Sequence, residues 1–276
     1  MSADFLREMA AASRARLKAA REEVPEPVLR NRALATTPPT PLRLHPLKFD
    51  LIAEIKLRSP AAGQLQGQGG ALGSRARQYA TAGAAAVSVL TEPTRFDGSL
   101  IHLKEAAACL AGTAAPAMRK DFLVDPYQIV EARAAGAGGV LVILRMLSRA
   151  QTEDLILEAR EQQLFVLLEA FDEADIELMH AVVDRHGGNA ASPLLAGLNC
   201  RDLSSLQIVP ERLEALAERL PASVPRVAES GLTTADDARR LAAVGYRLAL
   251  VGSALMRAAN HAPLIESMLA AGRHHA

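Results

Sequence analysis

Hydrophobic positions along this chain gather in short runs that recur from about residue 50 onward. Eight of these runs are nearly continuous in Val, Ile, Leu or Ala, and they begin about 22 to 35 residues apart. Continuous apolar runs indicate strands that are buried on both faces, as in a parallel sheet covered by helices. We therefore predict strands at Leu51–Lys56, Ala86–Glu92, Ala117–Phe122, Val140–Arg145, Leu164–Ala170, Leu194–Asn199, Arg226–Ser230 and Leu248–Ser253.

Longer stretches rich in Ala, Leu, Glu and Arg separate these runs, and their apolar residues have helical spacing. Asp125 is a natural N-cap before Pro126, and Ser148 has the capping-box spacing to Gln151. The predicted helices are Leu100–Leu110, Pro126–Ala135, Arg149–Gln162, Phe171–Arg185, Val209–Leu220, Thr234–Ala243 and Ala254–Leu269. Strands and helices that alternate without a long interruption predict the α/β class, as a single (β/α)₈ (TIM) barrel rather than an open doubly wound sheet.

The segment before the first strand has a different pattern. Asp4–Glu22 spaces its apolar residues for one helical face, and Thr36–Pro46 is proline-rich and is expected to be extended. This segment is too short to carry its own core. We therefore expect residues 1–47 to form an N-terminal helical extension packed on a catalytic barrel at residues 48–272. The glycine-rich stretch Gly63–Gly73 is predicted to be a mobile lid.

Composition and charge narrow the classes of function. The 31 basic and 31 acidic residues cancel, and Trp is absent, so nucleic-acid and membrane-surface binding are disfavoured. Cys109 and Cys200 have no metal-ligand spacing and are expected to be free thiols. The seven histidines are expected at the surface, and apart from the terminal His274-His275 none pairs with another at metal-ligand spacing. Because residues 1–22 lack a signal-peptide pattern and no apolar run has the length of a membrane span, we expect a cytoplasmic location.

Ionisable residues stand at the C-terminal ends of several predicted strands, where a buried strand should be apolar. The strand ends of a barrel converge on one face, and side chains two residues apart share a side of a strand. We therefore expect a single cavity to be lined by Glu54, Lys56, Lys120, Glu169 and Glu229. The alternative is an ion-pair network that only stabilises the barrel, but buried pairs are weak stabilisers, which favours a function.

Two short turns end the last two predicted strands. Ser230-Gly231 and Gly252-Ser253 each precede a predicted helix start. Exposed amides at such turns bind phosphate, and the loops after strands seven and eight are the usual phosphate site of this architecture. An ordinary turn has the same composition, so the prediction depends on the two turns occurring together. The chain has neither a Walker phosphate loop nor a GxSxG nucleophile elbow.

Segments spread over residues 48–270 resemble one known family. They read IAEIKLRSPAAG, AVSVLTEPTRFDGS, MRKDFLVDPYQIVEARAAGA, VLLEA, GLNCRDL, VAESG and LVGSALMRA. Together they resemble indole-3-glycerol phosphate synthase of tryptophan biosynthesis. The resemblance implies a carbon–carbon lyase that closes the ring of 1-(2-carboxyphenylamino)-1-deoxyribulose 5-phosphate with loss of carbon dioxide and water. It implies no cofactor and no metal.

The resemblance also implies roles for individual residues. Lys120 corresponds to the general acid and Glu169 to the carboxylate that handles protons during dehydration. Lys56 would bind the anionic groups of the substrate and act as a second proton donor, and Glu54 would orient the lysines or the substrate amine, which makes all four catalytic residues by implication. The implied substrate-binding residues are Ser59, Phe96, Phe122, Leu141, Ile143, Asn199, Arg201 and Glu229. The implied phosphate-binding residues are Lys56, Ser230, Gly231, Gly252 and Ser253.

Some positions leave alternatives open. Leu141 and Ile143 also fit a plain barrel core. Cys200 stands where the family often has Asn or Ser, and Arg95 stands where an aromatic residue is common. A paralogous indole-releasing lyase and a catalytically silent phosphate-binding barrel are the alternative functions. The expected partner is a small phosphorylated substrate, with no nucleic acid, membrane or obligate protein partner.

Overall fold

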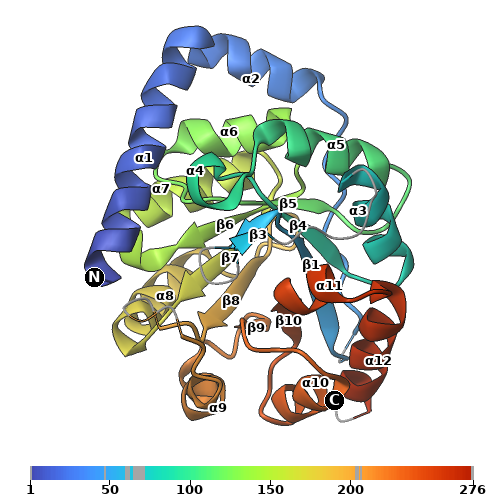
Figure 1. Ribbon diagram of the computed structural model, residues 1–276. Coiled ribbons are helices and arrows are strands. Elements are labelled where there is room, and N and C mark those ends of the chain that lie inside the picture. The colour runs from blue at the N-terminus through green and yellow to red at the C-terminus, as the bar shows by residue number, and fades with distance from the viewer. Residues whose placement is uncertain are drawn as a thin grey trace.

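The computed structural model describes residues 2–46, 48–59, 63–64, 72–202, 205 and 207–274. Within these residues, eight parallel strands close into a barrel in the order β1-β10-β9-β8-β7-β6-β5-β4, with helices around it (Figure 1). The barrel strands are β1 (Asp50–Ile55), β4 (Ala86–Leu90), β5 (Ala117–Lys120), β6 (Gly139–Ile143), β7 (Phe165–Ala170), β8 (Leu194–Asn199), β9 (Arg226–Glu229) and β10 (Leu248–Val251). The predicted (β/α)₈ barrel is confirmed.

The predicted helices lie where the periodicity places them, with two of them divided. The observed helices are α5 (Leu100–Leu110), α6 (Pro126–Ala134), α7 (Arg149–Glu161), α8 (Glu173–His186), α9 (Glu211–Leu216), α10 (Ala235–Ala243), α11 (Ser253–Arg257) and α12 (His261–Arg273), with 3₁₀ turns at Leu144–Met146 and Ala217–Arg219. Asp125 caps α6 and Ser148 closes a capping box with Gln151, as predicted. The predicted helix Ala254–Leu269 is wrong as one element, because Pro263 has no amide to continue a helix and fits only a first turn.

Several elements were not predicted. They are α2 (Glu26–Ala35), α3 (Leu72–Thr81), α4 (Pro93–Phe96) and the hairpin of β2 (Arg58–Ser59) with β3 (Gly63–Gln64). The predicted lid Gly63–Gly73 is wrong at its end, since Gly73 lies buried in α3. A Cβ at Gly73 would overlap Cys109 Sγ on α5, so this glycine allows two helices to pack closely. Residues 65–71 of the predicted lid lie outside the described residues.

The N-terminal helices pack against the barrel and its outer helices. α1 (Ser2–Glu23), dark blue in Figure 1, runs along one edge of the molecule, and α2 lies over α6. Leu6 and Met9 of α1 join the apolar cluster inside the barrel. Tyr127 of α6 donates its hydroxyl to the carbonyl oxygens of Ala20 and Val24, at 2.9 and 2.8 Å. The extension is therefore packed on the barrel, and its boundary at residue 47 stays a prediction.

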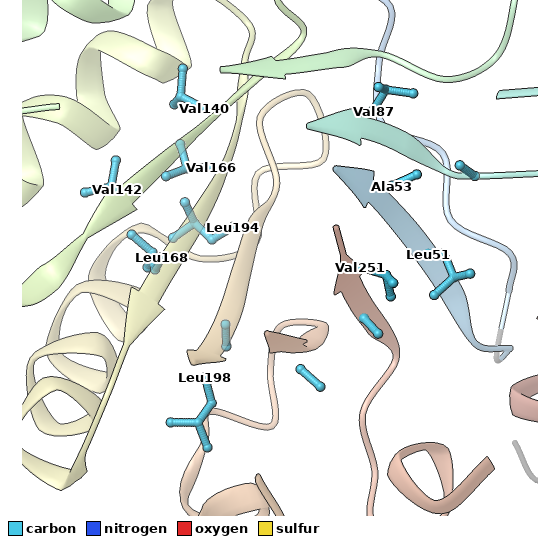
Figure 2. Packing of buried hydrophobic residues seen from close by; sticks show 14 of the residues in the cluster. Leu51, Ala53, Val87, Val140, Val142, Val166, Leu168, Leu194, Leu198 and Val251 are labelled. Carbon is cyan, nitrogen blue, oxygen red and sulfur yellow. The ribbon is translucent and has the colours of Figure 1, made fainter. Parts of the chain in front are cut away.

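Alternation along the strands divides the core into two layers. Residues such as Leu51, Val166 and Leu168 face outward, between the strands and the helices (Figure 2). The inward-facing layer contains Ile52, Ala86, Met118, Leu141, Phe165, Leu167, Leu195, Val227 and Leu248. Two residues further toward the C-terminal end of most strands, the next inward-facing side chain is polar or charged. This change from apolar to polar side chains puts the candidate site at the C-terminal ends of the barrel strands.

The expectation that all histidines lie at the surface is wrong. His186, in the last turn of α8, is buried, and the His261 ring packs edge-on against Tyr79 with centroids 4.9 Å apart. A histidine on the packed face of a helix is buried by its neighbours whatever its polarity, so a surface position for every histidine was wrong. Both cysteines are free thiols in this structure. In the described part of the chain, none of the helices has the length and apolarity needed to cross a bilayer.

Candidate active site

A cavity of about 240 Å³ opens at the C-terminal ends of the barrel strands. Its walls include the side chains of Glu54, Lys120, Glu169 and Glu229, from β1, β5, β7 and β9. The predicted convergence of charges from distant parts of the chain is therefore observed. Among the described residues, no group of three or more His, Cys, Asp or Glu side chains has an arrangement that would hold a metal ion.

Lys120 is the last residue of β5 and lies between two carboxylates. Its Nζ is 3.7 Å from Glu169 Oε1 and 3.7 Å from Glu229 Oε2. Burial lowers the pKa of Lys120, but the negative charges of Glu169, Glu229 and Glu54 outweigh it and raise this pKa above the usual lysine value. The ammonium therefore keeps its proton at neutral pH, as a group that donates a proton must before the reaction begins.

Lys56 and Glu54 form a close ion pair in the cavity. Lys56 Nζ lies 2.7 Å from Glu54 Oε1, and the Glu54 carboxylate is almost fully buried. Burial raises the pKa of Glu54, yet Lys56 and Lys120 together lower it below the usual range. The residue after β10 must be a glycine, Gly252, because a Cβ there would overlap Glu54 Oε1. One of the predicted phosphate-binding glycines thus also makes room for a carboxylate.

Glu169 and Glu229 have different surroundings although they lie side by side. Glu169 Oε1 accepts a hydrogen bond of 2.5 Å from Asn199 Nδ2, and Asn199 Oδ1 accepts from the amide of Arg201 at 3.0 Å. Both oxygens of Glu229 are buried and have no hydrogen-bond partner among the described residues. Burial and the neighbouring Glu169 raise the pKa of Glu229 well above the usual range, against the opposing effect of Lys120. We therefore assign the proton of this pair to Glu229.

Both predicted phosphate turns line the same cavity. Ser230 and Gly231 have left-handed backbones, with φ of +70° and +81°, and Gly252 precedes the first turn of α11. A Cβ at Gly231 would come within 3.2 Å of Cys200 Sγ, so the thiol packs directly behind the turn. Burial raises the pKa of Cys200 to about 11, which keeps it a neutral packing group.

Another part of the cavity wall is apolar. Phe96, Phe122, Leu141 and Ile143 all line it, and the Phe96 and Phe122 rings lie 6.1 Å apart. Leu141 and Ile143 also belong to the inner core cluster, so the core interpretation and the site interpretation both hold for them. Asn199 and Arg201 line the cavity as predicted, whereas the side chain of Ser59 lies outside the described residues.

Sequence reasoning missed part of this lining. Phe5 packs edge-on against Phe122 with ring centroids 6.0 Å apart, and Leu6 lies beside it in the cavity wall. The amphipathic pattern of α1 predicts that these residues are buried, but no local signal gives the place where the helix docks. Other unpredicted wall residues are Leu90, Asp121, Phe171, Ile208, Leu232, Thr233, Leu250, Val251, Ala254 and Arg257.

A family model described as indole-3-glycerol phosphate synthase matches residues 6–268. The chain belongs to this family. The match includes every barrel strand and nearly all of α1. All of the predicted site residues, from Glu54 to Ser253, therefore lie within the part of the chain that the family model matches.

Three similar proteins carry the name indole-3-glycerol phosphate synthase. The one from Nocardioides sp. is 44% identical over 60% of this chain and 59% of its own length. The one from Salinibacter ruber is 39% identical over 58% of this chain and 55% of its own length. The match thus spans little more than half of these two relatives. The protein from Verminephrobacter eiseniae is 38% identical over 74% of this chain and 76% of its own length.

Two solved structures share the barrel fold at low sequence identity. The 3-hexulose-6-phosphate synthase from Salmonella typhimurium gives a TM-score of 0.61 at 14% identity, covering 83% of this chain and 100% of its own. The thiamine phosphate pyrophosphorylase from Pyrococcus furiosus gives 0.54 at 16% identity, covering 80% and 93%. At this identity the likeness concerns the fold alone.

Proposed function

We propose that the protein is an indole-3-glycerol phosphate synthase, a carboxy-lyase of tryptophan biosynthesis. Its substrate would be 1-(2-carboxyphenylamino)-1-deoxyribulose 5-phosphate. The observation that carries the proposal is the Lys120 ammonium, 3.7 Å from both Glu169 and Glu229, in a cavity that also contains the two phosphate-type turns. Membership of the family supports the same reaction.

The cavity can accommodate the three parts of this substrate. The apolar wall around Phe96 and Phe122 suits the aromatic ring, and the turns at Gly231 and Ser253 suit the phosphate. Lys56, paired with Glu54 at 2.7 Å, supplies a positive charge for an anionic group of the substrate. The proposal needs no cofactor, metal, nucleic acid or membrane, and a cytoplasmic location stays a prediction.

The first chemical step is ring closure. An aromatic carbon attacks the ketone carbon, a carbon–carbon bond forms, and the electron pair of the carbonyl moves to its oxygen. Lys120 is the ammonium placed to protonate this oxygen, since the surrounding carboxylates raise its pKa and keep it charged. Departure of carbon dioxide then returns its bonding electrons to the ring. A positioned acid of this kind contributes about 10²–10⁴-fold to the rate.

The second step is loss of water from the closed ring. The new hydroxyl takes a proton and leaves as water, and the ring CH₂ carbon beside the nitrogen loses a proton as the double bond of the indole forms. Glu169 is the candidate base, because its Oε1 accepts a hydrogen bond from Asn199 and lies 3.7 Å from the Lys120 ammonium. Glu229 carries the proton of the pair and is proposed to position the substrate as a neutral acid.

The activity test mixes the purified protein with the carboxyphenylamino substrate and follows indole fluorescence. We expect turnover, and we expect Lys120→Ala and Glu169→Gln each to lower kcat by at least about 10²-fold. Lys104→Ala, at an exposed position of α5, is the matched control and should leave the rate unchanged.

Two further outcomes would replace the proposal. Release of free indole from added indole-3-glycerol phosphate, without ring closure, would make the protein an indole-releasing lyase. Thermal stabilisation by the substrate without any turnover would make it a silent phosphate-binding barrel.

A further inference from the structure

A single arginine of the N-terminal helix contacts the ends of two barrel strands. Arg16 Nη2 lies 2.7 Å from Asp121 Oδ1, and Arg16 Nη1 lies 3.5 Å from Glu92 Oε1. The two carboxylates are buried, whereas Arg16 comes from α1, outside the barrel. Asp121 follows the end of β5 and Glu92 follows the end of β4, so the guanidinium joins α1 to both.

The first of these contacts reaches the residue next to the general acid. Asp121 directly follows Lys120, and its Oδ1 also accepts a hydrogen bond from the amide of Phe122 at 2.8 Å. Asp121 Oδ2 accepts from Thr91 Oγ1 at 2.7 Å and pairs with Arg119 at 3.2 Å. The amide of Thr91 in turn donates to the carbonyl of Lys120 at 3.0 Å. The backbone on both sides of Lys120 is thus held by a network that ends at Arg16.

The second contact reaches the apolar wall. Glu92 caps the short helix α4 by accepting hydrogen bonds from the amides of Thr94 and Arg95, at 2.9 and 2.7 Å. Phe96 is the last residue of α4 and lines the cavity. Because α1 also brings Phe5 against Phe122, one side chain connects the acid strand, the α4 turn and the helix that completes the aromatic wall.

Removal of the Arg16 charge would leave buried carboxylates without one of their partners, so the network would rearrange. Arg119 already neutralises part of the negative charge through Asp121 and Glu131, with the Glu131 contact at 3.1 Å. Without Arg16, Asp121 would keep its pair with Arg119, and Glu92 would lose its ion pair in a buried setting. A buried charge without its partner is strongly unfavourable, so the segment around Asp121 is expected to shift toward water.

We propose that Arg16 is a positioning residue that sets the place of Lys120 relative to the aromatic wall by docking α1 on the barrel. The inference rests on the proposed synthase function, since it gives Lys120 the role of the acid. It adds a residue that no motif singles out and that lies in the N-terminal extension.

The kinetic test compares three variants at a temperature where all are folded. Arg16→Met should lower kcat by about 10- to 100-fold, since a displacement of about 1 Å at a reacting group has effects of this size. Arg16→Lys should recover part of the loss. Arg21→Met is the matched control, because Arg21 docks the same helix through Asp125 at 2.7 Å without touching Asp121 or Glu92. It should leave kcat unchanged.

A double-variant cycle separates positioning from general stabilisation. In a Lys120→Met background, Arg16→Met should reduce kcat little further, because the group that it positions is already absent. A further loss as large as in the wild type would overturn the proposal, and so would an unchanged kcat in Arg16→Met.

A measurement without turnover keeps this inference separate from the proposed function. The chain has five lysines, so reductive methylation with ¹³C-formaldehyde gives a simple NMR spectrum in which loss of a peak in Lys120→Met assigns Lys120. Arg16→Met should shift the Lys120 peak and its titration, and Arg21→Met should not. An unmoved Lys120 peak in Arg16→Met would sink the inference even if the protein is an active synthase. A moved peak in a protein that makes no indole glycerol phosphate would support the positioning and reject the synthase.

Discussion

The interior of the barrel has two levels that share one backbone and differ in chemistry. On four strands the inward side chain is apolar at one level and ionisable two residues later, in the pairs Ile52 and Glu54, Met118 and Lys120, Leu167 and Glu169, and Val227 and Glu229. The apolar members and the three glutamates are almost fully buried. Burial therefore does not distinguish the apolar (lower) level from the ionisable (upper) level. A gain in stability does not explain the upper level, because buried ion pairs stabilise weakly. The upper level is better explained by chemistry on a ligand.

The largest effect is expected when the upper level at β5 is made like the lower one. Lys120→Met keeps the length of the side chain and removes its charge, and kcat should fall by about 10²–10⁴-fold. The variant should also lose more stability than the wild type as the pH rises, because the raised pKa of Glu229 would no longer be opposed by the Lys120 cation 3.7 Å away. Steady-state kinetics and urea unfolding at several pH values measure both effects. A wild-type kcat in this variant would contradict the functional difference that we infer between the two levels.

The reciprocal change concerns the lower level. Leu167 is fully buried two residues before Glu169, and Leu167→Ala should destabilise the protein by about 2–5 kcal/mol through lost burial and a new cavity. The carboxylate and its partners stay in place, so kcat per folded molecule should remain within a few-fold of the wild-type value. Urea unfolding and kinetics at a temperature where the variant is folded measure the two quantities. A loss of kcat comparable with that of Lys120→Met would show that the levels are not separable.

The two levels also differ in how well the sequence predicts them. A strand buried on both faces gives a continuous apolar run, and a charge that interrupts its end is conspicuous, so the amino-acid pattern alone is enough to single out Lys120 and Glu169. The parity of each strand then places these charges inward. The glycines that make room for the charged side chains are harder to predict from the sequence. Gly252 is needed because Glu54 approaches it closely, and Glu54 lies on a strand far away in the sequence.

Elements that depend on tertiary contacts were predicted poorly. The helix α3 has a glycine near its start, and its buried residues Ala76 and Tyr79 give a short apolar face. Its strongest packing feature, Gly73 against Cys109, involves another helix. The docking of α1 depends in the same way on the ion pair between Arg16 and Asp121, which the sequence around either residue does not predict. A cavity lined by charged residues could thus be predicted from the strand ends, and the reaction only from the family resemblance, whereas α3, the docking of α1 and the contacts of Arg16 could not be predicted.

A third prediction tests the proton that we place on Glu229. Its pKa is raised in the folded protein, so it stays protonated there while the unfolded chain releases the proton near pH 4. The wild type therefore loses stability as the pH rises from about 4 through the folded pKa, by about 1.4 kcal/mol for each pH unit between the two values. Glu229→Gln cannot ionise and should lack this loss.

The comparison for Glu229 uses urea unfolding of both proteins between pH 4 and pH 8. The variant should gain on the wild type as the pH rises, even though it is expected to have lower activity. Glu169→Gln should show part of the same gain, because the Glu169 charge helps to raise the pKa of Glu229. Glu177→Gln, at an exposed position of α8, is the matched control and should not show the gain. A stability difference between the wild type and Glu229→Gln that does not depend on pH would place the proton elsewhere.

The smallest expected effect concerns the phosphate turn, where we expect the backbone rather than a side chain to bind. Ser230 has a left-handed backbone with φ of +70°, which costs a residue with a Cβ about 1 kcal/mol more than glycine. Ser230→Gly should therefore stabilise the protein by up to about 1 kcal/mol, with KM within about twofold of the wild type. Gly231→Ala, at φ of +81° and against Cys200, should do the opposite, losing stability and raising KM. A large rise of KM in Ser230→Gly would mean that the serine hydroxyl holds the phosphate, and the upper level would then depend on side chains at this turn as well.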